Sequence, residues 1–315
     1  GGETVAADRM RDALTDSAAL DAERVEPLRE RAGPGIRLVA PHLRGADMAL
    51  DLPWAKLFIA PLPPTRLHLS LPQEMRLTLQ GRSLDFAADT AGAILGLSPL
   101  RRIAMDDAHL SATGLRLDGT GLARLVEGTM SLQPLGHDAP RMAGAAYDMS
   151  LRARDMQPEA MDLLGFPGLP AAVSGDARGR LWFDDAIFPQ SGQMPRLVGL
   201  QTDQAELRIG DLTLRLATHV VADEAGRATG RVALYTRDAD ALLDQLVAVG
   251  IVPTQALPPL RLGLAGLGRA QLSPAEGQPD LPQPKPDELR LTLEFRDGQT
   301  FLGPVGLGAA PLFPR

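Results

Sequence analysis

Apolar and polar residues alternate through most of the chain after Gly35. In "RLHLSL" (66–71) leucine occupies every second position, and "MRLTLQ" (75–80) repeats the pattern with methionine and leucine. A period of two places the apolar side chains on one face of an extended segment and the polar side chains on the other. This pattern is typical of antiparallel strands that have one buried and one solvated face.

The same alternation recurs along the chain and predicts further strands. The segments are 82–88, 108–119, 147–155, 179–185, 205–221, 230–237, 260–266 and 287–303. Turn residues separate several of them, in "LDGTG" (117–121), "DEAGRATG" (223–230) and "RDGQ" (296–299). The Asp297-Gly298 pair in the last of these predicts a tight hairpin.

Helices are predicted for a minority of residues. The strongest candidate is 236–250, where Asp238 suits an N-cap, Leu242, Leu243, Leu246 and Val247 form one apolar face, and Gly250 suits the position after the helix. Apolar residues spaced at three and four also predict a helix at 4–31, and Pro158 in a first turn predicts a short one at 157–165. A further helix is expected at 120–128, whereas 90–97 is ambiguous.

These elements predict a mainly β fold of the α+β class, in which long antiparallel strands form curved sheets with a few packed helices. The expected organisation is an N-terminal helical segment (1–35), a first β-rich half (36–165) and a second β-rich half (166–315), or one continuous elongated domain. The Pro-rich stretch 273–288 is expected to be an exposed loop.

Composition narrows the function classes. The 315 residues carry a formal net charge of -7, which disfavours binding to nucleic acid, and only 4% aromatic residues, which leaves few rings for stacking on bases or sugars. There is no cysteine, so disulfides and thiol chemistry are excluded. No apolar run reaches the ~18–20 residues of a membrane-spanning helix.

Candidate catalytic and metal-binding residues are sparse. In "MDDAHL" (105–110), Asp107 and His109 share one face of a strand and Asp106 lies on the other, which favours a polar strand edge over a metal site. Asp184 and Asp185 are adjacent and would point to opposite faces, so they do not form an acid–base pair. We therefore expect no catalytic residues, no metal site and no cofactor, although side chains distant in sequence leave a hydrolase open as a third hypothesis.

Five histidines are scattered, at 42, 68, 109, 137 and 219, without the spacing of a metal or catalytic motif. Two glycine clusters resemble phosphate-binding loops. "GLAGLG" (263–268) does not follow the strand–glycine–helix order of a dinucleotide site. Gly303, Gly306 and Gly308 are better interpreted as small residues on a terminal edge strand.

The most informative feature is an apolar face shared by several strands in the second half. It is either an ordinary core covered by helices or an open surface that binds acyl chains or a hydrophobic partner. The candidate ligand-facing residues are Leu207, Ile209, Leu212, Leu214, Leu216, Val232, Leu234, Leu289, Leu291 and Leu293.

Two stretches resemble a bacterial family known as domain of unknown function 2125. In 205–250 a strand pair with a "D..G...G.L.L" turn leads into a "D...LL..L...G" helix, and 296–311 is similar to the family's ending, "LGP..LG.AP". The resemblance spans roughly residues 40–311. It implies a periplasmic envelope protein of Gram-negative bacteria with long strands reminiscent of AsmA-like proteins, anchored to the inner membrane by a segment absent from this chain. It supplies no catalytic residues.

The resulting first hypothesis is a non-catalytic envelope protein whose curved sheet binds lipid or another hydrophobic ligand. The alternative is a structural or accessory subunit that docks on an inner-membrane protein complex through a sheet edge or the N-terminal helix.

Overall fold

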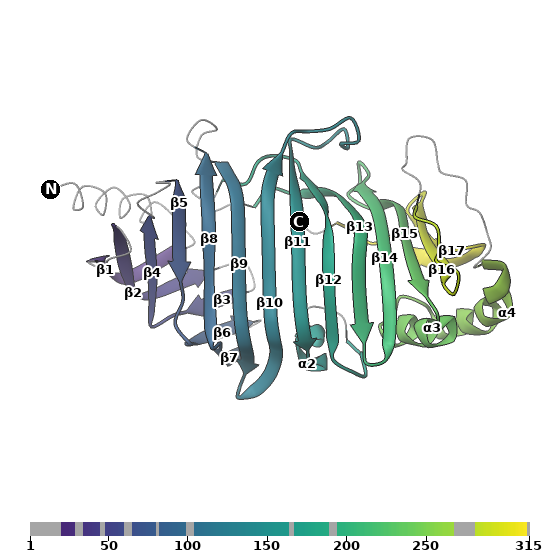
Figure 1. Ribbon diagram of the computed structural model, residues 1–315, viewed down its shortest axis with the longest axis horizontal. Helices are drawn as coiled ribbons and strands as arrows, with labels where there is room; N and C mark the ends of the chain where they lie inside the picture. The colour runs from purple at the N-terminus through teal and green to yellow at the C-terminus, as the bar shows by residue number, and fades with distance from the viewer. Residues whose placement is uncertain are drawn as a thin grey trace. The chain divides into compact units, whose positions relative to one another are not determined.

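The computed structural model describes residues 20–28, 34–44, 48–59, 65–79, 82–98, 104–163, 167–188, 194–267 and 281–313. Strands dominate and helices are few, which confirms the mainly β prediction (Figure 1). The chain divides into two compact units. Unit 1 comprises residues 1–132 and 186–195, and unit 2 comprises residues 133–185 and 196–315. The main division falls between Leu132 and Gln133, earlier than the expected 165/166 boundary.

Unit 1 is built from antiparallel strands. They are β1 (Leu20–Leu28), β2 (Gly35–Arg44), β3 (Met48–Asp51), β4 (Trp54–Ile59), β5 (Arg66–Ser70), β6 (Glu74–Leu79), β7 (Arg82–Ala87), β8 (Thr90–Ser98), β9 (Ala104–Leu117) and β10 (Thr120–Gln133). Strand β2 divides its pairing near Ala40, which has a positive φ of 46°. Residues 35–39 pair with β4, and residues 42–44 pair with β3.

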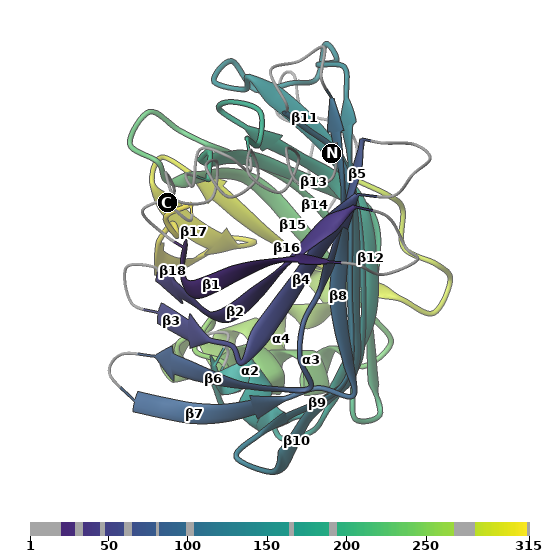
Figure 2. The same cartoon turned by 90° about the vertical axis from the view of Figure 1, so that its left-hand side faces the viewer.

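The two branches from β2 meet again at β9. One branch runs through β4, β5 and β8, and the other through β3, β6 and β7, so the pairings form a closed circuit. Figure 2 shows β4 and β8 on one side and β6 and β7 on the other. A hydrophobic cluster of Ile36, Leu38, Leu52, Ala55 and Met75 lies in this unit.

Unit 2 is a meander in which each strand pairs antiparallel with the next. Its strands are β11 (Ala145–Met156), β12 (Val173–Phe183), β13 (Leu197–Ile209), β14 (Leu212–Ala222), β15 (Ala228–Thr236), β16 (Leu289–Arg296), β17 (Gln299–Leu302) and β18 (Val305–Ala309). Its helical elements are α2 (Pro158–Leu163), α3 (Ala239–Ala248), the 3-10 turn η3 (Thr254–Ala256) and α4 (Leu257–Leu267).

Helix α3 follows its predicted pattern. The side chain of Asp238 accepts a hydrogen bond from the backbone N–H of Ala241 at 2.9 Å and caps the helix. Leu242, Leu243 and Leu246 are buried in one cluster with the apolar side chains of β14–β16. Burial of this face against the sheet, rather than helix propensity alone, stabilises so short a helix.

The predicted turns are also confirmed. Asp297 and Gly298 have φ of 51° and 70° and join β16 to β17, while Asp118 and Gly119 have φ of 47° and 79° and join β9 to β10. Two successive positive φ values are what the favoured two-residue hairpin turn requires. Gly306 and Gly308 lie on strand β18, which pairs with β17, as predicted. Gly303 instead lies in the turn between these two strands, with a positive φ of 59°.

Three sequence predictions are wrong. Residues 20–28 of the predicted 4–31 helix form strand β1 and pair with β2, whereas residues 4–19 lie outside the described residues. Residues 120–128 form part of β10, because the Asp118-Gly119 turn returns the chain along β9. Residues 260–266 belong to helix α4, in which Leu260 is buried and Leu262 is 91% exposed.

A close contact at Gly199 gives a stability prediction. A Cβ atom added there would lie 2.9 Å from Cε3 of Trp182 and 3.0 Å from Cγ of Pro140. Because the Trp182 ring is fully buried, we expect Gly199→Ala to lower the free energy of unfolding by about 1–3 kcal/mol. Urea denaturation measures the change. The control is Gly306→Ala, whose added Cβ would meet Phe301 at an ordinary 3.8 Å; equal effects of the two variants would contradict the close contact.

Candidate functional site

The candidate ligand-facing residues lie on one face of the unit 2 sheet. Cross-strand pairing aligns them with each other, as in the row Leu207, Leu214 and Thr236. Leu214, Leu234, Leu291 and Leu293 are buried in the cluster that includes α3. The others are half-buried: Leu207, Ile209, Leu212, Leu216 and Val232 pack against the same cluster, and Leu289 lies beside them at the start of β16.

One row of paired residues crosses this face from β11 to β16, and we call it the unit 2 ladder. It consists of Leu151, Ala177, Ala205, Leu216, Leu234 and Leu291. Exposure changes along the ladder: Leu291 is 0% exposed and Leu151 is 44% exposed. The apolar face is therefore covered at the α3 and α4 end. On β11 it is open at Leu151, between the buried Tyr147 and Ala153 of the same side.

Small residues make up the face beside Leu151. Strand β12 presents Gly175, Ala177 and Gly179 on this side, each paired with a residue of β11. Strand β12 thus has glycine and alanine, rather than large side chains, beside the exposed Leu151. The side chains of Leu207 and Thr202 on β13 lie over Gly175 and Gly179, so these glycines are half-buried and Leu151 is the exposed side chain of this region.

Unit 1 has a similar row, which we call the unit 1 ladder. Leu57, Leu69, Ala93, Leu110 and Gly128 are paired in succession from β4 to β10. Leu57 and Leu69 pack against the unit 1 cluster, whereas Leu110, in the middle of β9, is 52% exposed. Each unit therefore leaves one end of an apolar row open.

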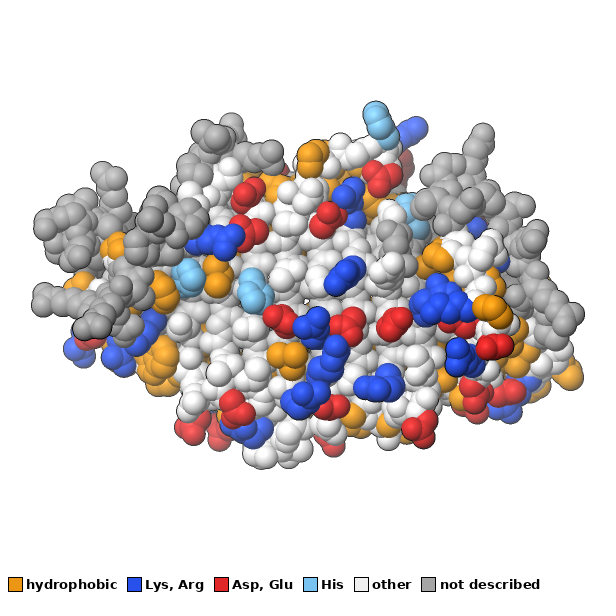
Figure 3. Space-filling view, in the orientation of Figure 1, with side chains coloured by type: hydrophobic (Ala, Val, Ile, Leu, Met, Phe, Trp, Pro, Cys, Tyr) orange, Lys and Arg blue, Asp and Glu red, His pale blue; other side chains and the backbone are white. Residues whose placement is uncertain are grey.

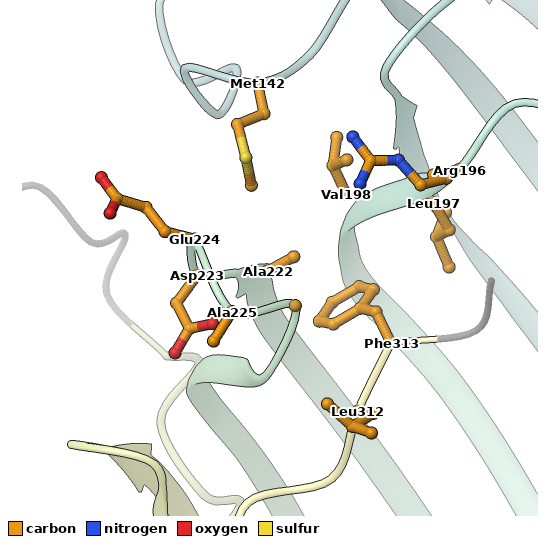
Figure 4. A pocket seen from close by; sticks show the side chains of 11 residues that line it. Met142, Arg196, Leu197, Val198, Ala222, Asp223, Glu224, Ala225, Leu312 and Phe313 are labelled. Carbon is orange, nitrogen blue, oxygen red and sulfur yellow. The ribbon is translucent and has the colours of Figure 1, made fainter.

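A small pocket lies at the start of β13, beside the β14–β15 turn and the C-terminal segment (Figure 4). Its volume is about 150 Å³, and its lining includes Met142, Val198, Phe313 and Arg196. Arg196 already binds Asp184, with its Nε 2.8 Å from the carboxylate. The pocket is smaller than the ~300–1,000 Å³ typical of small-molecule sites, which disfavours it for a lipid.

A larger pocket of about 550 Å³ lies near the start of α3, between β14, β15 and residues 285–288. Arg215 and Glu288 dominate it: Nη2 of Arg215 lies 2.6 Å from Oε2 of Glu288, and the two side chains are 17% and 11% exposed. The Arg215 hydrogen bond holds the pKa of Glu288 below its usual range. Since the two charges satisfy each other, this pair is a structural link rather than a free anion site.

Tyr235 completes this network. The guanidinium of Arg215 lies 4.0 Å from the Tyr235 ring centroid, and the Tyr235 hydroxyl donates to the carbonyl of Pro282 at 2.5 Å. Burial raises the pKa of the Tyr235 hydroxyl. These contacts hold residues 281–288 against the polar face of β14 and β15.

Three of the polar residues singled out in the sequence, Asp107, His109 and Asp184, have separate ion-pair partners. Asp107 lies 3.6 Å from Arg66, and His109 lies 3.2 Å from Glu127. Asp184 accepts hydrogen bonds from the side chain and backbone of Arg196, which lower its pKa. Within the described ranges, no three carboxylate or imidazole side chains gather closely enough to hold a metal ion.

The other histidines are also dispersed. His42 lies 2.6 Å from Asp51, His68 stacks on Phe58 with ring centroids 4.8 Å apart, and His219 meets Trp182 edge-on. These contacts involve different strands, so the structure does not bring the histidines into a common site.

Two features of the site were not found from the sequence. The first is the set of exposed leucines, Leu110 and Leu151, which alternation alone cannot distinguish from buried ones. The second is the link between Arg215 and Glu288, 73 residues apart. Nothing in the sequence signalled this link beyond the expectation that the Pro-rich stretch 273–288 is an exposed loop.

The fold and the surface define a mainly antiparallel β protein in which each unit has an exposed leucine on the apolar side of its sheet. The sequence model of a bacterial family, domain of unknown function 2125, described as an uncharacterized protein conserved in bacteria, matches residues 34–311. The chain belongs to this family, as the two resembling stretches predicted. No curated protein and no solved structure matches it. Over the residues that the structure describes, no helix is both long and apolar enough to cross a membrane.

Proposed function

We propose that this protein is a non-catalytic envelope protein whose apolar sheet faces bind the acyl chains of a lipid or a similar hydrophobic ligand. The observation that carries the proposal is the exposure of Leu110 and Leu151. Both lie within paired strands, on the same side as their unit's hydrophobic cluster, yet they are 52% and 44% exposed. The apolar face of a sheet is normally buried against another layer of secondary structure.

The covered and open parts of the unit 2 face have different roles in this proposal. Leu291, Leu234 and the α3 leucines form the folded core, which fixes the sheet. Leu151 supplies the exposed surface, beside the half-buried Ala177 of β12. The predicted ligand-facing residues of β14–β16 would then support the site from the covered end, while β11 and β12 contact the ligand.

The type of exposed residue favours an acyl chain over a protein partner. In the described part of the chain, the exposed large hydrophobic residues are leucine, isoleucine and methionine, and none is aromatic. Protein interfaces usually depend on Trp, Tyr and Arg anchors. An acyl chain needs only continuous aliphatic contact, which leucine and alanine provide.

A periplasmic location is part of the proposal and rests on the family resemblance. Fusion of the full-length natural protein to a reporter that is active only outside the cytoplasm tests it directly. Reporter activity is the expected result, and a cytoplasmic signal would contradict the envelope assignment.

Substitution of the two exposed leucines tests lipid binding. Leu110→Glu and Leu151→Glu each place a carboxylate where an acyl chain would lie, and burial of a charge without a partner is strongly unfavourable. We expect each variant to weaken binding of a fluorescent acyl-chain probe by at least about tenfold, since loss of an aliphatic contact and charge burial together exceed 1.4 kcal/mol. Fluorescence titration measures the affinity.

The matched control is Leu262→Glu. Leu262 is 91% exposed on α4, outside both ladders, so the same change there should leave probe binding unaltered. Circular dichroism and thermal unfolding should be the same for all three variants, because the replaced side chains are exposed. Absence of probe binding by the unaltered protein, or equal weakening by Leu262→Glu, would contradict the proposed function.

A further inference from the structure

The opposite face of the unit 2 sheet has an excess of arginine over β11–β13, although the whole chain is acidic. Arginine and acidic side chains intermingle over these strands (Figure 3). The arginines on this face are Arg152, Arg154, Arg178, Arg180 and Arg208, and the acidic residues among the described side chains are Asp148, Asp155, Asp176 and Glu206. The local charge is therefore positive.

The aspartates on this face are already engaged. Asp176 accepts from both Arg152, at 3.1 Å, and Arg154, at 2.8 Å. Asp148 binds Arg180 at 2.8 Å. Asp176 thus pairs with two arginines, and Asp148 pairs with one.

Arg178 and Arg208 remain without a hydrogen-bond or ion-pair partner among the residues that the structure describes, and both are exposed. Arg178 is paired across the ladders with Ser150 and Gln204. Arg208 is paired with Ser174 and Thr213. The residues paired directly with both arginines are therefore neutral. Among the side chains that the structure describes, Asp176 and Glu206 lie two positions before Arg178 and Arg208 on the same strands, and Asp155 accepts from Ser174 at 3.5 Å.

We propose that this polar face docks on an anionic lipid surface through Arg178 and Arg208. A guanidinium binds phosphate oxygens in a bidentate manner, and an anionic bilayer presents many phosphates in one plane. The arginines are likewise spread over neighbouring strands of one sheet face rather than gathered in a pocket. This inference depends on the charge of the polar face and not on the ligand of the apolar face.

Nucleic acid fits the same face less well. The exposed large hydrophobic residues of the described chain include no aromatic ring that could stack on a base, and the net charge of -7 opposes a polyanion that would contact much of the surface. A lipid surface contacts only the face that is turned toward it, and repulsion from distant acidic residues is screened beyond ~10 Å at 0.1 M salt.

Vesicle co-sedimentation tests the proposal with the full chain. We expect binding to vesicles of phosphatidylcholine with about 30% phosphatidylglycerol, and little binding to phosphatidylcholine alone. Arg178→Glu and Arg208→Glu should each lower the partition coefficient at least about fivefold, and the double variant should lower it further. Raising the salt concentration should weaken binding of the unaltered protein.

The charge-matched control is Arg237→Glu, an exposed arginine with no partner among the described residues, which lies in the turn before α3 and outside β11–β13. The Arg237→Glu variant should retain most of the vesicle binding of the unaltered protein. The proposal is overturned if the double variant binds anionic vesicles as well as the unaltered protein does, or if Arg237→Glu weakens binding as much as Arg178→Glu. It is also overturned if a nucleic-acid duplex or an acidic protein binds this face more tightly than the vesicles do. Because vesicle docking and probe binding involve opposite faces, failure of either leaves the other proposal standing.

Discussion

Leu291→Ala should lower the free energy of unfolding by about 3 kcal/mol, one of the two largest effects expected for a single substitution in this chain. Leu291 is 0% exposed at the covered end of the unit 2 ladder and belongs to the cluster that joins the sheet to α3. Removal of its side chain leaves a cavity that the paired strands cannot close by moving together. Chemical denaturation of the unaltered and substituted chains measures the difference.

Leu262→Ala is the control for this experiment. The same side chain is removed, but from a position on α4 that is 91% exposed, so the change should remain within about 0.5 kcal/mol. Similar losses for the two variants would show that the sheet face beneath α3 is not the packed core of unit 2.

Arg215→Ala should also destabilise the chain by about 3 kcal/mol, because it leaves the carboxylate of Glu288 without its main partner in a largely buried position. The Tyr235 ring would lose the guanidinium that lies over it. In contrast, Arg152→Ala should lower the free energy of unfolding by less than about 1 kcal/mol. It breaks the ion pair with Asp176, in which the two side chains are 51% and 53% exposed.

The effect of Arg215→Ala should depend on pH. The pKa of Glu288 is lowered in the folded protein, chiefly by the Arg215 hydrogen bond, so the pair contributes its full stability above the ordinary carboxyl range. That contribution is lost as the pH falls through the lowered pKa, since a protonated Glu288 no longer pairs with Arg215. Unfolding curves between neutral and acidic pH should therefore converge for the two proteins, and a gap that widens at acidic pH would contradict the assignment.

Local patterns predicted the fold class because the alternation of apolar and polar residues identifies strands without any information on distant contacts. The hairpins at Asp118-Gly119 and Asp297-Gly298 have the positive φ values that their sequences favour. Helix α3 carries an N-cap and an apolar stripe that act within one segment. Such features need no knowledge of distant contacts.

The errors arise where tertiary contacts decide between two patterns. Leu260, Leu262 and Leu264 alternate as a strand would, but Leu257, Leu260 and Leu264 also form a helical face that packs on the unit 2 core. In β1 the helix-forming residues of 20–28 are overridden by pairing with β2. The closed circuit of unit 1 depends on contacts such as that of β7 with β9, which no local pattern indicates.

The candidate site was only partly predictable for the same reason. Alternation identified the apolar face of β13–β16, but the exposure of a leucine depends on which helix covers it. Leu151 and Leu291 have the same residue type and occupy the same ladder, and α3 and α4 distinguish them. The open end of the ladder could therefore be identified only from the positions of the helices and strands in the structure.

Photo-crosslinking with a phospholipid that carries a diazirine on its acyl chain tests the central claim most directly. After irradiation and proteolysis, mass spectrometry locates the labelled peptides. We expect labels in β11 and β12 around Leu151 and in β8 and β9 around Leu110, the open ends of the two ladders. Labels confined to α4 around Leu262, or no labelling above that of a protein without a lipid site, would contradict lipid binding by the open apolar faces.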